Sequence, residues 1–306
     1  MVDTLARPGS ILEETLAQIQ NTLGSEFETI TITRVVIGIF FTGVKLSDGS
    51  GGICFTPIKD IPEAVCCPSS ARAMPYPRRF AGRSTADFTR HLPHAPPLKK
   101  AIGIAIVNAL SESCRKRRPD LCAGMVTGAD ALESIPLPDE GYIVVVGALV
   151  PILKRLKNRG KSFGILELDL RTLKSDELPF TIPGERADAE IHRADMLVVT
   201  GTTLLNNTLE SLLALARPGA TIIVVGPTAS MLPSAFFRRG VTVLGGDVVT
   251  NADALLDTIA EGGSGYHFFG KSAEKTTVFK PGTKGGWPLE ETIRPYEENS
   301  HEMQIL

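Results

Sequence analysis

The 306-residue sequence predicts an α/β protein in which a helix and an antiparallel meander precede a doubly wound parallel sheet. The sheet is indicated by short apolar runs that alternate with amphipathic segments from Tyr142 onward, the pattern of strands alternating with helices. The first part shows a stretch of helical periodicity and then strand-like runs. We expect four parts: an α+β domain over 1–120, a connector over 121–140, the sheet domain over 141–262 and a C-terminal arm over 263–306.

The first domain should open with a helix at Ser10. Ser10 and Glu13 have the spacing of a capping box, and apolar residues then recur at helical spacing until Gly24. Strands are expected over 29–33, 35–46 and 52–56, with a turn at 48–51 between the last two. A second long helix should run from Leu98 to the basic residues 115–118, whose charges complement the helix dipole.

Five strands are expected in the sheet domain, over 143–146, 163–168, 196–199, 221–225 and 241–244. Helices should lie over 152–158, 186–193, 209–216, 231–238 and 252–261. The order of the strands stays open, because two common doubly wound orders both place Gly147 where the order reverses. One order sets Gly147 beside the loop after Thr200, and the other sets it beside the loop at Gly226.

Composition excludes several classes of partner. A formal net charge of −2, with 22% charged residues, gives no bulk attraction to nucleic acid or to an anionic membrane. No apolar run approaches the roughly 18 residues that span a bilayer, and the acidic, amphipathic N-terminus does not have the pattern of a secretory signal. The five cysteines have no CxxC spacing. We therefore expect a cytoplasmic protein with reduced thiols.

Two polar loops at expected strand ends are the best candidates for a binding site. The first loop carries Thr202, Thr203, Asn206, Asn207 and Thr208 ahead of a helix. Capping that helix requires only one such side chain, and the surplus predicts a binding role towards carboxylate or phosphate oxygens. Gly226, Thr228 and Ser230 should face this loop from the next strand, since ligands of parallel sheets bind at the carboxyl ends of the strands.

Other chemistry has weaker support. Gly147 does not begin a GxGxxG motif, but Glu167 ends the second strand twenty residues later, where a carboxylate could accept hydrogen bonds from the ribose of a nucleotide or of S-adenosylmethionine. The candidate metal ligands do not have the spacing of a closed zinc site: Cys66, Cys67, His91, His94 and His192. We expect His192 to pack within a helix and Asp195 to begin a strand. No GxSxG nucleophile motif is present.

Two stretches of the sheet domain carry a resemblance to a known family. Residues 194–210 (ADMLVVTGTTLLNNTLE) and 225–231 (VGPTASM) resemble the pattern TGTTLvNGTle followed by GPSaPm. That pattern belongs to a family described as "putative heavy-metal chelation" and long catalogued as of unknown function. Residues 81–84 and 98–111, with Asn108, resemble its N-terminal partner domain. Asn207 replaces the usual Gly and Ser230 the usual Pro, and the added side chain at 207 puts ligand identity in doubt.

The resemblance implies an enolase N-terminal-like α+β domain, a Rossmann-like domain and a site between them. Our first hypothesis is that this cleft binds a small anionic or metal-chelating molecule, with Asn108 closing it and any heavy metal arriving in the bound chelator. A second hypothesis is a transferase that uses S-adenosylmethionine or a nucleotide held by Gly147 and Glu167. A third is a non-catalytic subunit with a degenerate cleft. The sequence does not decide whether the protein is an enzyme.

The C-terminal arm carries aromatic residues in an otherwise polar segment: Phe268, Phe269, Phe279 and Trp287. Such residues favour an ordered arm that lies on the body of the protein or on a second copy in a homo-oligomer, although a solvated tail is an equally good interpretation.

Overall fold

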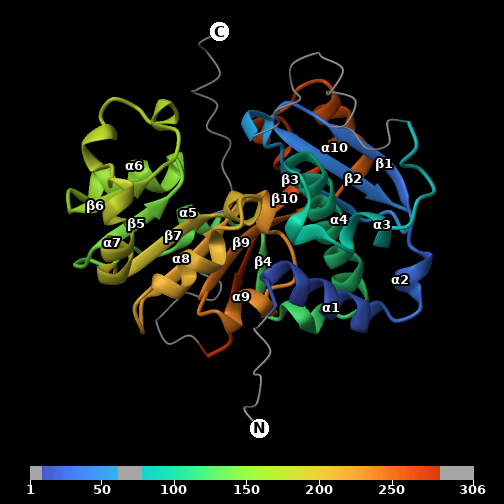
Figure 1. The fold of residues 1–306 in the computed structure, drawn as a ribbon, viewed down its shortest axis with the longest axis horizontal. Coiled ribbons are helices and arrows are strands. Elements are labelled where there is room, and N and C mark those ends of the chain that lie inside the picture. Colours follow the sequence, from blue (N-terminus) through green and yellow to red (C-terminus); the bar gives the residue numbers. More distant parts are fainter. Residues whose placement is uncertain (1–8, 61–77, 283–306) are drawn as a thin grey trace.

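The computed structural model describes residues 9–60 and 78–282, which form two β-sheets (Figure 1). The smaller sheet is antiparallel, with β1 (Ile32–Ile37), β2 (Phe41–Leu46) and β3 (Gly51–Phe55) in sequence order. The larger sheet has the order β4-β10-β9-β8-β7-β5-β6. Its strands are β4 (Met125–Thr127), β5 (Ile143–Val146), β6 (Phe163–Leu166), β7 (Met196–Thr200), β8 (Thr221–Val225), β9 (Val243–Val249) and β10 (Ala273–Phe279). The predicted α/β class is confirmed.

Helices pack on both sheets. They are α1 (Ile11–Leu23), α2 (Glu26–Thr29), α3 (Ala86–Thr89), α4 (Pro97–Arg117), α5 (Ala131–Ser134), α6 (Val150–Arg159), α7 (Ala187–Arg193), α8 (Leu209–Leu215), α9 (Ser234–Arg238), α10 (Ala252–Ala260) and α11 (Gly265–Phe268). Short 3₁₀ helices near the site are η1 (Ile58–Asp60), η4 (Leu92–His94), η9 (Gly201–Leu204) and η10 (Pro227–Ala229). Across 9–60 and 78–282, no helix combines the length and the apolar character that a bilayer crossing requires.

The first helix begins as the capping box predicts. The Ser10 hydroxyl accepts a hydrogen bond from the Glu13 amide at 3.2 Å, and the Glu13 carboxylate accepts one from the Ser10 amide at 2.7 Å. These reciprocal bonds satisfy backbone donors that the first helical turn leaves without partners.

The break within the meander lies elsewhere than expected. We predicted strands over 29–33 and 35–46, but β1 ends at Ile37 and β2 starts at Phe41, while Thr29 lies in α2. The chain turns at Gly38 because it passes very close to α10: a Cβ atom at Gly38 would lie 2.6 Å from the carbonyl oxygen of Ile259. Alternation of residue types does not reveal such a contact, since it depends on a helix more than 200 residues away.

The small sheet lies between a helix from the first half of the chain and a helix from its end. On β3, Cys54 belongs to the core that α4 shares, whereas Ile53 packs with Leu256 and Ile259 of α10. Adjacent strand residues face opposite sides of a sheet, so α4 and α10 cover opposite faces. The sequence assigned α10 to the second domain, yet α10 packs against β1 and β2.

The order of the parallel strands, which the sequence left open, is β6-β5-β7-β8-β9. This is the doubly wound order in which the first strand is flanked by the second and the third. Consequently β5 pairs with β7, and Gly147 lies beside Thr200. The strand order therefore reverses between the loops that follow β5 and β7.

Two further strands, β10 and β4, extend this sheet beyond the predicted set, and only β10 runs antiparallel to the others. β4 comes from the expected connector, and β10 comes from the expected arm. β10 pairs along its whole length with β9, from Ala273 opposite Val249 to Phe279 opposite Val243, and it also pairs with β4. Phe268 is buried, with its ring centroid 5.3 Å from that of Phe41 in the small sheet. Residues 265–279 thus belong to the body of the protein; Trp287 lies outside the described residues.

Candidate functional site

Gly147 and Thr200 are in contact at the carboxyl edge of the sheet. Gly147 follows β5 with φ of 101°, and a Cβ atom there would lie 2.8 Å from the Thr200 methyl carbon. Only glycine combines this backbone conformation with so close an approach. The two loops after β5 and β7 are therefore held together where ligands of doubly wound sheets bind.

The loop after β7, residues 200–208, is stabilised by its own hydroxyl groups. The Thr203 hydroxyl donates to the Thr200 carbonyl oxygen at 2.7 Å, and the hydroxyls of Thr200 and Thr202 lie 3.1 Å apart. The Asn206 side-chain oxygen accepts from the amide and the hydroxyl of Thr208 at 3.2 and 2.7 Å. Thr203 is buried, Thr202 is half-buried, and Asn206 and Thr208 are exposed. Hydrogen bonds within the loop thus hold these side chains in place.

Asn207 occupies the position where the family pattern has glycine, and its backbone explains that preference. Its φ is 59°, in the left-handed region that asparagine tolerates better than other residues with a side chain. Its side-chain nitrogen donates to the Pro93 carbonyl oxygen at 3.2 Å, and its side-chain oxygen accepts from Lys100. The added side chain therefore anchors loop 200–208 to the first half of the chain.

The second polar loop, residues 226–230, is also engaged by the protein itself. Thr228 is buried, and its hydroxyl accepts from the Phe55 amide at 3.1 Å. The Ser230 hydroxyl donates to the Asp247 carboxylate at 2.5 Å and accepts from the Asp247 amide at 2.9 Å. Thr228 and Ser230 thus join this loop to β3 and β9, and Gly226 adds a backbone bond to the Gly245 carbonyl oxygen at 2.9 Å.

One face of α4 contacts both loops through polar side chains. Besides Lys100 on Asn207, the Asn108 amide nitrogen donates to the carbonyl oxygens of Ile53 and Pro227 at 2.8 and 3.0 Å. Two further side chains of α4 contribute contacts. The Ser111 hydroxyl accepts from the Leu232 amide at 3.2 Å, and Arg115 donates to the Ser230 carbonyl oxygen at 3.1 Å. We call Lys100, Asn108, Ser111 and Arg115 the polar face of α4.

Asn108 is the one member of this face that the sequence singled out, whereas Lys100, Ser111 and Arg115 were missed. Their spacing of eight, three and four residues is the signal that could have found them, because it keeps all four on one side of a helix. That signal was hidden by the apolar residues that surround them, since α4 is buried on nearly every side.

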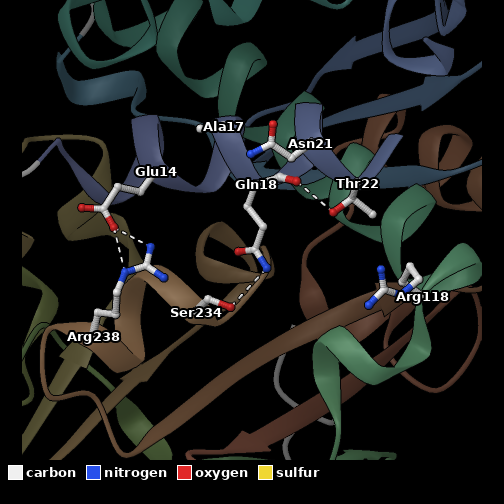
Figure 2. Close-up of a pocket in the computed structure, with 8 residues that line it drawn as sticks. All are labelled: Glu14, Ala17, Gln18, Asn21, Thr22, Arg118, Ser234 and Arg238. Carbon is white, nitrogen blue, oxygen red and sulfur yellow. Dashed lines mark hydrogen bonds and ion pairs between the residues drawn. The ribbon is translucent and has the colours of Figure 1, made fainter. Parts of the chain in front are cut away.

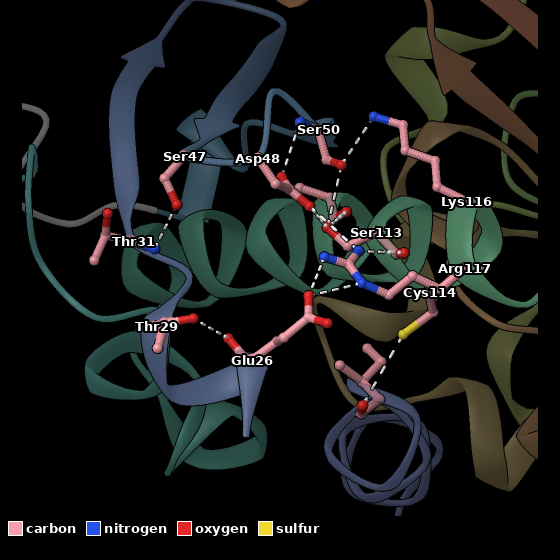
Figure 3. A network of polar contacts seen from close by, with 12 residues as sticks. Glu26, Thr29, Thr31, Ser47, Asp48, Ser50, Ser113, Cys114, Lys116 and Arg117 are labelled. Atoms are coloured by element: carbon pink, nitrogen blue, oxygen red, sulfur yellow. Dashed lines mark hydrogen bonds and ion pairs between the residues drawn. The ribbon is translucent and has the colours of Figure 1, made fainter. Parts of the chain in front are cut away.

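Lys116 and Arg117 of the basic run hold the end of α4 in place (Figure 3). Lys116 donates to the Ser50 hydroxyl at 3.1 Å, and Arg117 donates to the Glu26 carboxylate at 2.9 Å. Arg118 pairs with Asp120 at 2.8 Å. These contacts agree with a structural role of Lys116 and Arg117 at the end of α4.

Burial shifts the pKa of three groups at the junction between the two sheets. It lowers the pKa of Lys100, which nearby Glu210 and Cys54 oppose. It raises the pKa of the Cys54 thiol to about 12 and that of the Asp247 carboxyl to about 7, although the Ser230 hydrogen bond and Arg115 act in the opposite direction on Asp247. Burial thus disfavours the charged forms of these three groups.

Gly147 and Glu167, the predicted cofactor residues, follow paired strands. Val146 of β5 is opposite Leu166 of β6, so the two residues lie at the same level of the carboxyl edge. The Glu167 carboxylate accepts from the Asp169 amide at 2.9 Å. Asp169 also forms an ion pair with Lys59 of η1, which links the small sheet to this edge. Arg171 and Lys59 hold the pKa of the Asp169 carboxyl well below its usual range.

The candidate metal ligands are scattered where they are described. His91 and His94 are exposed around η4, and His192 is exposed in the last turn of α7 rather than packed. Asp195 does precede β7 as expected, and its carboxylate accepts from the Tyr142 amide at 2.6 Å. Cys66 and Cys67 lie outside the described residues. Within 9–60 and 78–282, no three His, Cys, Asp or Glu residues are grouped to hold a metal ion.

Two cavities differ in place and character. A groove of about 510 Å³ lies between α1 and α9 (Figure 2), and it contains none of the predicted site residues. Its charged groups already have partners, because Glu14 pairs with Arg238 and Arg118 pairs with Asp120. A smaller cavity of about 170 Å³ lies at the end of β8 and against the middle of β9, beside Gly226 and Pro227. We give the smaller cavity more weight because of its position on the sheet.

Comparison with protein families gives two matches. A family model described as "Putative heavy-metal chelation" matches residues 130–278, and a second model with the same description matches residues 20–111. The first match extends through β9 and almost all of β10, so these strands are within the region that the family shares.

Individual relatives have little assigned function. An uncharacterised protein of Methanocaldococcus jannaschii is 29% identical over 184 residues, covering 58% of this chain and 66% of that protein. A protein of unknown function from the DUF364 family of Pyrococcus horikoshii superposes with a TM-score of 0.69 at 17% identity, over 88% of this chain and 100% of the other. A DUF364 protein of Desulfitobacterium hafniense gives 0.62 at 15% identity with the same coverage. At these identities, the two structures establish a shared fold alone.

Proposed function

The chain belongs to the family described as "putative heavy-metal chelation", and from this premise we propose that it binds a small anionic or metal-chelating molecule in the cleft between its two sheets. Loops 200–208 and 226–230 contact the molecule, with Thr202, Thr203, Asn206, Asn207, Gly226, Thr228 and Ser230 as the binding residues. Asn108 supports the cleft from α4.

The observation that carries this proposal is the attachment of both loops to the first half of the chain. Asn207 is held by Lys100, and Thr228 is held by the Phe55 amide. Loops at the carboxyl edge of a parallel sheet are the usual ligand-binding elements of this architecture. Fixing the loops in advance reduces the conformational entropy that the loops themselves would lose when a ligand binds.

The chemistry of these loops suits the oxygen atoms of a chelator better than a bare heavy metal. Their polar groups are hydroxyls and side-chain amides, which hydrogen-bond carboxylate or phosphate oxygens well. Soft metals prefer thiolate and imidazole ligands. The proposal therefore has the metal, where one is present, arrive already bound to the chelator.

Titration calorimetry with three probes tests the proposal: citrate, Zn²⁺ alone and the zinc–citrate complex. We expect citrate or its zinc complex to bind more tightly than Zn²⁺ alone, and we expect a Thr202→Val, Asn207→Gly double variant to lose at least tenfold in that affinity. Glycine at 207 keeps the left-handed backbone, so the variant should fold. Equal affinity in the double variant would remove these loops from the site.

Native mass spectrometry of the freshly purified full chain, with elemental analysis of the same sample, covers chelators other than citrate. A retained small molecule at stoichiometric level supports the proposal and identifies the ligand class. A bare protein mass, together with no binding of citrate or zinc–citrate, contradicts it.

Gly147 and Glu167 lie at the same level of the carboxyl edge of the sheet. This placement favours a second candidate, a transferase that uses S-adenosylmethionine or a nucleotide. A carboxylate at the end of the neighbouring strand is where doubly wound proteins bind a ribose. S-adenosylmethionine should then raise the melting temperature, and Glu167→Gln should abolish the increase. Absence of any increase in the unmodified chain argues against this candidate.

A further inference from the structure

The smaller cavity, at the end of β8, contains an ion pair that neither proposed function uses. Its walls are contributed by residues 225–227, residues 245–246, the start of α5, the middle of β10, and residues 149, 151 and 269. Asp130 and Lys275 face each other there, and their side chains are 11% and 20% exposed. Pairs this well shielded from water are uncommon unless packing or ligand binding requires them.

Each member of the pair is held by a second contact. The other carboxylate oxygen of Asp130 accepts from the Leu132 amide at 2.8 Å, which fixes the side chain against α5. The Lys275 ammonium lies 5.4 Å from the centre of the Phe269 ring, which also lines the cavity. The cavity wall thus presents one fixed anion and one fixed cation side by side.

The volume limits the ligand that this cavity takes. Pockets that hold drug-sized ligands measure roughly 300–1,000 Å³, and about 170 Å³ is well below that range. Apart from Thr276, the remaining lining residues are apolar or glycine, with Leu132, Val225, Gly245 and Gly246 among them. The space suits a molecule of the size of a small amino acid.

Charge limits the ligand further, because the wall carries both signs and no net charge. A zwitterion can lie across the pair with its ammonium near Asp130 and its carboxylate near Lys275, so every charge keeps an opposite neighbour. A simple carboxylate would compete with Asp130 for Lys275 and leave a shielded anion without its partner, which is costly. A simple amine would compete with Lys275 for Asp130, which is costly for the same reason.

We propose that this cavity is a binding site for a small zwitterion of the α-amino acid type, recognised by Asp130 and Lys275. The site is additional to the cleft of the proposed function, and the two share Gly226 and its neighbourhood as a common wall. The proposal holds whether or not the cleft binds a chelator.

The test compares three probes of similar size by saturation-transfer NMR and titration calorimetry on the full chain: L-alanine, propionate and ethylamine. L-alanine should bind, and the two singly charged probes should bind at least tenfold more weakly. L-serine and L-threonine extend the test to a polar and a larger side chain. Failure of all three amino acids to bind, or equal binding of propionate and L-alanine, overturns the proposal.

Two variants assign the binding to the ion pair. Lys275→Met keeps the aliphatic stem, and Asp130→Asn keeps an oxygen that can accept from the Leu132 amide. Each should weaken L-alanine binding at least tenfold, whereas Lys161→Met, in an exposed pair with Glu140 at the opposite edge of the sheet, should leave it unchanged. Circular dichroism checks folding; should Lys275→Met misfold, the Asp130→Asn result decides.

The Thr202→Val, Asn207→Gly double variant separates the two sites. L-alanine binding that survives in this variant supports the cavity, even where citrate binding is lost. L-alanine binding that disappears in this variant and survives in Lys275→Met places the amino acid in the cleft and overturns the assignment to the cavity.

Discussion

Lys100 and Asn207 connect the two halves of the chain through a hydrogen bond from a buried ammonium group to a side-chain amide oxygen. The second acceptor of Lys100 is also neutral, the Pro93 carbonyl oxygen at 3.3 Å. The two hydrogen-bond acceptors of this shielded lysine are thus neutral, and a nearby carboxylate, Glu210, favours its charged form. Because Lys100 lies on α4, a substitution at this residue should alter how loop 200–208 is held.

Replacing Lys100 with Met should change how stability depends on pH. Burial lowers the pKa of Lys100, so the unfolded chain binds more protons, and its contribution makes stability rise as pH increases towards the unfolded value of 10.5. Lys100→Met removes that contribution. The stability of the variant minus the stability of the unmodified protein should therefore be larger at pH 7 than at pH 10.

Urea unfolding at pH 7, 8.5 and 10 measures this difference. Lys99→Met is the control, because Lys99 is the neighbouring lysine on α4 and is partly exposed. A difference between Lys100→Met and the unmodified protein that stays constant with pH would refute the prediction.

Asp247→Asn should stabilise the protein at pH 8. Burial raises the pKa of Asp247 to about 7 from 3.8, so the folded protein binds more protons and loses stability as pH rises from about 4 to 7. Asparagine cannot ionise and can still accept from Ser230. We expect a gain of up to about 4 kcal/mol at pH 8, disappearing near pH 4.

Urea denaturation of Asp247→Asn at pH 4.5, 6 and 8 checks the trend. Asp253→Asn serves as the control, because Asp253 is exposed and pairs with Lys45 at the surface. Loss of stability at pH 8 in Asp247→Asn would mean that the ionised carboxylate is required by the fold.

Substitutions at Asn207 should separate backbone conformation from side-chain contact. Asn207→Ala must keep φ near 59° without a side chain suited to it, at a cost of about 1–2 kcal/mol. Asn207→Gly loses the same contacts with Lys100 and Pro93 but fits the backbone. The glycine variant should therefore be the more stable of the two by about 1 kcal/mol in chemical denaturation; equal stability would show that the loop relaxes.

Gly147→Ala should destabilise the sheet edge by about 2–4 kcal/mol, because the new methyl group meets Thr200 and the backbone has a φ of 101°. Adding Thr200→Ser removes the methyl carbon that the new side chain would overlap while keeping the hydroxyl. A double-mutant cycle should then recover at least about 1 kcal/mol of the loss. Strictly additive effects would show that the contact is not the source of the strain.

Local sequence patterns predicted a helix or strand well where the residues of that helix or strand alone determine its position. The capping box at Ser10 and the strands of the parallel sheet depend on neighbouring residues, and they lie close to where they were expected. The break at Gly38 depends on Ile259, and β10 depends on the free edge of β9. Contacts so distant in sequence leave no periodic signal, and they account for the errors in the fold.

The same reasoning applies to the site. Loops 200–208 and 226–230 could be selected because their polar residues exceed what capping requires. Lys100 could not, because a lysine within an apolar helix is normally assigned to the surface, and its partner Asn207 is 107 residues away. The Asp130–Lys275 pair was equally hidden, since it joins the predicted connector to the predicted arm.

The position of α10 sets an order of events during synthesis. The small sheet is made first, yet Ile53 has its apolar partners Leu256 and Ile259 on a helix that the ribosome completes some 200 residues later. Until then one face of that sheet has no apolar cover from α10. The first half of the chain therefore cannot complete the apolar core on this face of the small sheet until α10 has been synthesised.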